Sequence, residues 1–81
     1  MTADQLKDLI TAGLPCEHIH IPKGDGTHWD AIIVSAKFEG VSRVGRRRLV
    51  YGTLGNRIDT NEVHAFSMQT LTPAEWAAAQ V

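Results

Sequence analysis

Apolar residues at helical spacing open the chain and predict a helix near the N-terminus. They recur at the three- and four-residue intervals of one helix face: Leu6, Leu9, Ile10 and Leu14. Thr2, followed three residues later by Gln5, has the pattern of a capping box. We expect the helix to stop at Gly13, because glycine favours helix ends and Pro15 cannot continue a helix.

Alternation of polar and apolar positions then predicts two strands. Over 16–21, cysteine and histidine alternate with glutamate and isoleucine, which would place Ile19 and Ile21 on an inner face. The segment 29–36 is rich in isoleucine and valine and predicts the second strand. A short loop rich in turn residues, 22–26, separates the two strands, so we expect an antiparallel hairpin.

A helical stripe returns in the middle of the chain. We expect 41–45 to be an irregular turn or a single helical turn. The segment 46–58 places Val50, Leu54 and Ile58 on one face and predicts a helix. Two glycines within this segment weaken the prediction, because each costs about 1 kcal/mol relative to alanine.

The last part of the chain predicts a strand followed by a short helix. The strand is expected over 62–70. Thr72, Pro73 and Glu75 are typical of a helix start: an N-cap, a proline at the first helical position and a capping-box carboxylate. We expect this helix to run from Pro73 to about Gln80.

The predicted order is α-β-β-α-β-α, an α/β (α+β) fold with a three-stranded mixed sheet. The third strand follows a crossover helix, which allows it to pair parallel to the second. Three strands cannot close into a barrel. We therefore expect the helices to pack on one face of the sheet and the other face to be partly open.

The composition favours one small domain over 1–81. The chain is 43% hydrophobic and 21% charged, which is ordinary for a globular domain and unlike a disordered one. The longest apolar run, 31–34, is far too short to span a bilayer, and the N-terminus lacks a signal-peptide pattern. A single cysteine suits a reducing compartment. We expect a cytoplasmic protein with no membrane partner that is a monomer or weak dimer alone.

Histidine and cysteine are the candidate ligand types, but they form no compact metal motif. His18 and His20 lie two residues apart and would share one face of a strand. Weak metal binding and a solvated polar face both agree with that spacing, and the role of Cys16 is equally open. No carboxylate pair, nucleophile–base pair or Cys-x-x-Cys motif is present, so we expect no enzymatic activity.

The densest charge cluster contains four arginines: Arg43, Arg46, Arg47 and Arg48. The formal net charge of −1 argues against general electrostatic binding of nucleic acid, so such binding would need a local patch. Positive charge at a helix start opposes the helix dipole. The cluster therefore either faces an anionic group, such as phosphate or an acidic protein surface, or forms a solvated turn.

Four blocks of the sequence resemble the BolA family in order and spacing. They are Val-Ser-Ala-Lys-Phe-Glu-Gly at 34–40, Arg-Arg-Arg-Leu-Val-Tyr at 46–51, Val-His-Ala-Phe-Ser at 63–67 and Leu-Thr-Pro-Ala-Glu-Trp at 71–76. The loop at 24–29 and the compact length resemble the short, acid-stress-linked bacterial branch of that family. Arg47 is a departure, because the family often has a histidine at this position.

The resemblance implies a fold similar to the class II KH domain. The Gly-x-x-Gly loop with which KH domains bind nucleic acid is not matched, because four residues separate Gly40 from Gly45. A second candidate, Gly52 to Gly55, falls inside the predicted helix. Binding of RNA by the KH route is therefore not expected.

The resemblance also implies a non-enzymatic partner of a monothiol glutaredoxin. Such a heterodimer shares a 2Fe-2S cluster that is also held by glutathione, and it serves iron-sulfur cluster trafficking or assembly, or iron and stress sensing. His64, from the Val-His-Ala block, and His28, at the end of the loop between the first two strands, are the implied metal ligands. Imidazole can replace thiolate on one iron of such a cluster. The isolated chain is expected to hold no cofactor.

A DNA-binding transcriptional regulator is the alternative function that the resemblance implies. Its nucleic-acid-binding residues would be the four arginines of the cluster, Arg43, Arg46, Arg47 and Arg48. The near-neutral net charge weakens this alternative, as does the lack of a clear face of side chains suited to reading base edges.

Overall fold

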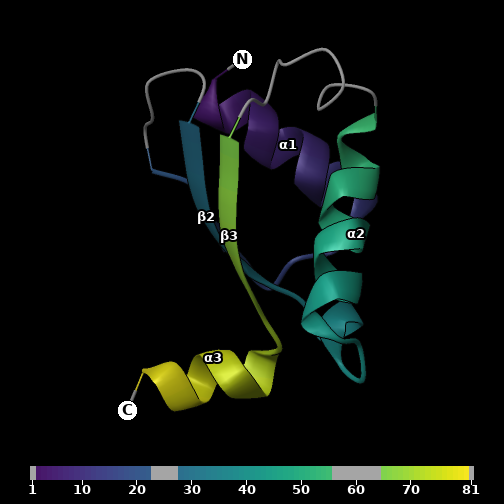
Figure 1. Cartoon of the computed structure of the whole chain (residues 1–81). Coiled ribbons are helices and arrows are strands. Elements are labelled where there is room, and N and C mark those ends of the chain that lie inside the picture. The colour runs from purple at the N-terminus through teal and green to yellow at the C-terminus, as the bar shows by residue number, and fades with distance from the viewer. Residues whose placement is uncertain (1, 23–27, 56–64, 81) are drawn as a thin grey trace.

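The computed structural model describes residues 2–22, 28–55 and 65–80 (Figure 1). In chain order the elements are α1 (Ala3–Gly13), β1 (His18–His20), β2 (His28–Val34), the 3-10 helix η1 (Ala36–Phe38), α2 (Arg43–Thr53), β3 (Ala65–Leu71) and α3 (Pro73–Ala79). The predicted order α-β-β-α-β-α is confirmed, with η1 added after β2.

The three strands form one mixed sheet in the order β1-β2-β3. β1 pairs antiparallel with β2, with Ile19 opposite Ile33. β2 pairs parallel with β3 in an unbroken register, and α2 lies in the crossover between them. Both predicted pairings are therefore confirmed.

α1 and α2 pack on the same face of this sheet (Figure 1). Burial alternates along β2 over residues 29–33, because Trp29, Ala31 and Ile33 are buried whereas Asp30 is exposed and Ile32 is half-buried. The core between the helices and the sheet consists of nine buried apolar residues: Leu6, Ile10, Leu14, Trp29, Ala31, Ile33, Phe38, Val50 and Leu54.

α3 lies beyond the C-terminal end of β3 rather than beside α1 and α2 (Figure 1). Its Trp76 side chain stacks on His18, with ring centroids 4.7 Å apart and an interplanar angle of 17°. His18 points to the opposite side of β1 from Ile19, which packs against the core. α3 therefore contacts the sheet face that α1 and α2 leave open, and none of its residues is buried.

The helix bounds differ from the predicted ones for local reasons. α2 begins at Arg43 rather than at residue 46, because the Ser42 side chain accepts a hydrogen bond from the Gly45 N–H and caps the helix there. Its predicted C-terminal residues, 56–58, lie outside the described part of the chain. α1 includes Gly13 and ends as Leu14 turns extended before Pro15. No helix in the described ranges is long and apolar enough to cross a membrane.

The strand bounds are also shifted. β1 is limited to His18–His20, and β2 ends at Val34 because the Ser35 hydroxyl caps the start of η1. β3 extends one residue further than predicted, to Leu71, and residues 62–64 lie outside the described residues.

Candidate functional sites

The start of β2 meets the start of β3. In the parallel register, the backbone of His28 is the partner of Ala65, which directly follows His64 in the chain. His28 is described only as a backbone position, and His64 lies outside the described residues. Of the two histidines that the sequence suggested as ligands, the structure therefore places only the backbone of His28, opposite the residue that follows His64.

The backbone of His28 is held close to the core. Trp29 follows it directly, is only 3% exposed and belongs to the core cluster. β2 contacts β3 along all seven of its residues, so its first residue is part of a continuous parallel ladder. A strand end fixed in this way orients a ligand better than a free loop does.

The described residues contain no group of three or more histidine, cysteine, aspartate or glutamate side chains that could hold a metal ion. His18 and His20 share one face of β1, as predicted, and both are exposed. His18 is used in the stack on Trp76. His20 borders a shallow depression of about 310 Å³ on the open face, together with Asp30 and Gln69.

Cys16 has the surroundings of a packing residue. Its thiol donates a hydrogen bond to the Leu14 carbonyl at 3.1 Å, and its side chain packs against the core. Burial raises the pKa of the Cys16 thiol, and the neighbouring Glu17 carboxylate raises it further. The protonated thiol is a poor nucleophile and a poor metal ligand at neutral pH.

Arg46 is not part of an exposed arginine patch, which corrects the expectation from the sequence. It is 8% exposed, and its guanidinium donates three hydrogen bonds. Nε bonds to the Val41 carbonyl at 2.9 Å, and one terminal nitrogen bonds to the Thr70 carbonyl at 2.9 Å and to Glu75 Oε1 at 2.8 Å. The guanidinium also lies over the Phe38 ring, 5.9 Å from its centroid. Three of the five guanidinium N–H donors are used within the fold and the side chain is buried, so Arg46 is poorly placed to meet a phosphate.

The ion pair of Arg46 and Glu75 ties α2 to the first turn of α3. The hydrogen bond from Arg46 lowers the pKa of the Glu75 carboxyl, and the Thr72 backbone N–H lowers it further. Because the pKa of Glu75 is lower in the folded protein than in the unfolded chain, the ionised carboxylate stabilises the fold, and this contribution is fully present at pH values above the ordinary pKa of glutamate. That contribution is lost as the pH falls through the lowered value.

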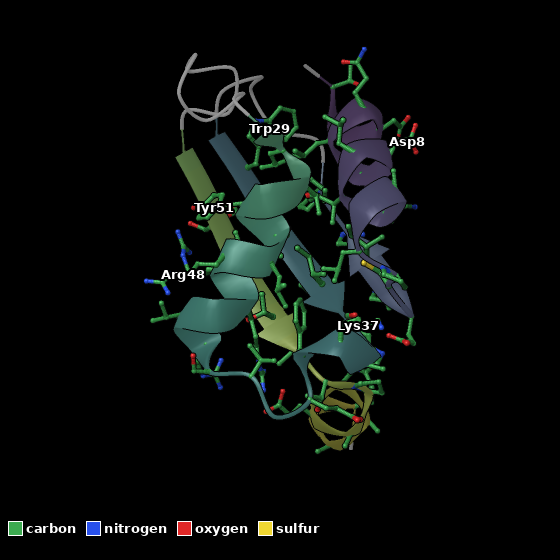
Figure 2. All side chains as sticks on the ribbon, turned by 90° about the vertical axis from the view of Figure 1, so that its right-hand side faces the viewer. Asp8, Trp29, Lys37, Arg48 and Tyr51 are labelled. Atoms are coloured by element: carbon green, nitrogen blue, oxygen red, sulfur yellow. The ribbon has the colours of Figure 1, made fainter. Side chains whose placement is uncertain are left out.

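The other three arginines of the cluster are exposed: Arg43, Arg47 and Arg48. Arg47 is positioned by Tyr51, because its guanidinium donates a hydrogen bond to the Tyr51 hydroxyl and lies 5.1 Å from the ring centroid. Figure 2 shows Arg48 and Tyr51 extending from α2 toward the side on which β3 lies. We call Arg43, Arg47 and Arg48 the arginine patch.

The Arg46–Glu75 pair is the contact that the sequence prediction missed. A signal was present, because Arg46 lies four and eight residues before Val50 and Leu54 and so continues the apolar stripe of the helix. Glu75 was recognised only as the capping-box residue of α3, a role that the structure also shows.

Comparisons with known proteins agree with this fold. The family model for BolA-like proteins matches residues 13–75. The chain is 38% identical over 77 residues to the acid stress protein IbaG of Escherichia coli K12, covering 95% of this chain and 90% of IbaG. A solved bolA protein homologue from Coxiella burnetii has a TM-score of 0.78 at 34% identity and covers 95% of this chain and 97% of its own.

The solution structure of BolA1 from Mus musculus has a TM-score of 0.82 at 28% identity, and the match covers all of this chain and 76% of that one. A mixed three-stranded sheet with three helices in this order is thus shared with solved BolA folds. The chain belongs to the BolA family. Its similarity to IbaG agrees with the expected acid-stress-linked bacterial branch.

Proposed function

We propose that this chain is a non-enzymatic partner of a monothiol glutaredoxin, with which it forms a heterodimer that shares a 2Fe-2S cluster. The role is iron-sulfur cluster trafficking or assembly, or iron and stress sensing. His64 is the main ligand from this chain and His28 the auxiliary one. The glutaredoxin cysteine and a bound glutathione supply the thiolates.

The observation that carries this proposal is the register of β2 and β3. His28 pairs with Ala65, and His64 is bonded directly to Ala65. The register therefore brings the His28 backbone opposite the residue whose covalent neighbour is His64, and adjacent Cα atoms in a chain are about 3.8 Å apart. Two imidazole nitrogens from one region suit the ligation of one iron.

The donor set fits a shared site better than a resident one. The described residues hold no group of three ligand-type side chains, and two histidines leave a four-coordinate iron incomplete. When bound, the cluster supplies redox and iron-carrying chemistry. The role of this chain is to present the imidazoles of His28 and His64 and to accept the glutaredoxin surface.

The experiment compares His64→Ala and His28→Ala with the parent chain in complex with cluster-loaded glutaredoxin and glutathione. We expect His64→Ala to lose more cluster absorbance than His28→Ala, because the resemblance implies the histidine of the Val-His-Ala block as the family's ligand, whereas the second ligand, from the loop that precedes β2, is histidine or cysteine depending on the branch. The measurements are the visible absorption spectrum and the size of the complex.

His20→Ala is the matched control, because His20 is an exposed histidine of the neighbouring strand and is not part of the pair. It should retain the parent spectrum. All three variants should melt as the parent does, so that a lost spectrum reports ligation rather than unfolding. A His64→Ala complex with the parent spectrum and stability would show that His64 is not a ligand.

DNA binding is the second candidate, because Arg43, Arg47 and Arg48 are all exposed on one helix. Burial of Arg46 reduces the number of phosphate contacts available to α2 from four to three. The salt dependence of the DNA affinity tests this function, because it reports the number of phosphate contacts.

A further inference from the structure

Within the described residues, the outer edge of β3 carries none of the sequence features that usually protect an edge strand. β3 has seven residues, none of them charged or proline, and its register with β2 has no bulge. The opposite edge strand, β1, has only three residues. Natural proteins protect long edges with charges, prolines, bulges or covering segments, because unpaired backbone groups accept a further strand.

Hydrogen bonds at the end of β3 show which of its backbone groups face outward. The N–H and C=O of one residue point to the same edge of a strand, and neighbours alternate. The Leu71 carbonyl accepts from Ser35, directly after β2, so odd-numbered residues of β3 face β2. The even-numbered residues, Phe66, Met68 and Thr70, therefore turn their N–H and C=O groups to the outer edge.

Among the described residues, side chains cap the C-terminal end of this outer edge. Arg46 donates to the Thr70 carbonyl, and Glu75 accepts from the Thr72 N–H. Thr70 is accordingly 4% exposed. Met68 is half-buried, and within the described residues no side chain bonds to its backbone groups. The open part of the edge thus extends from Met68 toward Phe66.

The positive charge of α2 beside this edge favours an added strand that carries negative charge. α2 carries the arginine patch and no acidic residue between Arg43 and Thr53. Arg48 and Tyr51 project on the β3 side of α2 (Figure 2), and Arg47 is bound to Tyr51. A second copy pairing through the same edge would bring two arginine patches together, which is unfavourable.

We propose that the outer edge of β3 binds an extended acidic segment of a partner protein as a fourth strand of the sheet. Main-chain hydrogen bonds to Met68 and Phe66 hold the segment, as in other cases of β-strand addition. Every second side chain of the added strand faces α2, where a carboxylate meets Arg47 or Arg43. This inference uses neither histidine as a ligand and goes beyond the proposed function.

The test uses the chain alone, without glutaredoxin or iron. A negative result would therefore contradict the strand-addition proposal without bearing on the cluster proposal. The probe is a fluorescent peptide of alternating glutamate and valine, about eight residues long, and the measurement is its anisotropy. Two comparison peptides replace glutamate by lysine, or carry N-methyl groups on alternate residues. N-methylation removes the donors of one peptide edge and keeps the charge.

We expect the acidic peptide to bind, and both comparison peptides to bind at least about tenfold more weakly, since a tenfold change corresponds to one or two hydrogen bonds. Met68→Pro should weaken binding about tenfold, because it removes an outward N–H that the ladder with β2 does not use. Arg47→Glu should weaken binding to a similar degree.

Met68→Ala is the matched control, because it keeps the backbone N–H and should retain affinity. If Met68→Pro does not fold, the N-methylated peptide decides the question on the parent chain.

Equal binding of the methylated and unmethylated peptides would show that the contact depends on charge alone and would overturn the proposal. A dimer of the chain abolished by Met68→Pro would assign the edge to a second copy. Displacement of the peptide by a lower concentration of single-stranded DNA would assign the surface to nucleic acid.

Discussion

A single side chain, Arg46, joins three segments of the molecule. Its guanidinium reaches the Val41 carbonyl before α2, the Thr70 carbonyl at the end of β3 and the Glu75 carboxylate in α3. The planar fork of arginine places several donors at fixed angles, which lysine cannot reproduce. Arg46 is therefore a positioning residue for α3 and for the end of β3.

Replacing Arg46 with methionine tests this role. We expect Arg46→Met to lower the free energy of unfolding by about 2 kcal/mol, because a buried carbonyl that loses its donor costs about 1–3 kcal/mol. Denaturant unfolding followed by circular dichroism measures the loss. Arg48→Met, on the exposed side of the same helix, should stay within about 0.5 kcal/mol of the parent. Equal stabilities of the two variants would show that the buried contacts of Arg46 are unimportant.

At the scale of elements, α1 packs tightly against α2 at Gly13. A Cβ atom built on Gly13 would lie 2.9 Å from the Thr53 Cγ2 atom, which is closer than real Cβ contacts. Gly52, in α2, is also helical but has no atom within 4 Å of a built Cβ. A glycine-to-alanine substitution would therefore be crowded at Gly13 and would have free space at Gly52.

Gly13→Ala should lower the free energy of unfolding by about 1 kcal/mol, because overpacking costs about 1–3 kcal/mol and outweighs the helix propensity of alanine. Gly52→Ala should raise the free energy of unfolding by about 0.5–1 kcal/mol, because the higher helix propensity of alanine is not offset by any steric clash at that position. Adding Thr53→Ser to Gly13→Ala removes the Cγ2 atom and should restore most of the loss. Thermal unfolding of the four chains measures these effects, and a stabilising Gly13→Ala would contradict the close approach.

The elements also show what the sequence could predict. Both capping boxes were visible in the sequence and occur in α1 and α3, because a cap depends on residues three positions apart. Helix rotation places Arg46 on the stripe of Val50 and Leu54 and away from Arg47 and Arg48, but its partners, Thr70 and Glu75, follow only from tertiary packing. The pairing of His28 with Ala65 likewise depended on strand register, because the hydrophobic pattern excludes a slip by one residue but not a slip by two.

At the scale of the whole molecule, charge is balanced in sum but not in space. The formal net charge is −1, yet α2 carries the arginine patch and no acidic residue. Long-range attraction of a polyanion depends on both the sum and the local patch. Three exposed arginines on a nearly neutral protein favour weak, sequence-independent contact with DNA over specific recognition.

Duplex DNA binding should therefore weaken with salt at a log–log slope of about −2.7, from about 0.9 per phosphate contact. Arg47→Glu/Arg48→Glu should abolish the binding. The matched control is Lys7→Glu/Lys37→Glu, which lowers the net charge equally but changes exposed residues outside the patch. Only the arginine variant should lose affinity, as measured by anisotropy of labelled DNA across a salt series. Equal losses of affinity in both variants would show that binding depends on net charge. Tight binding of one DNA sequence near physiological salt, together with far weaker binding of a scrambled sequence, would instead establish a specific regulator.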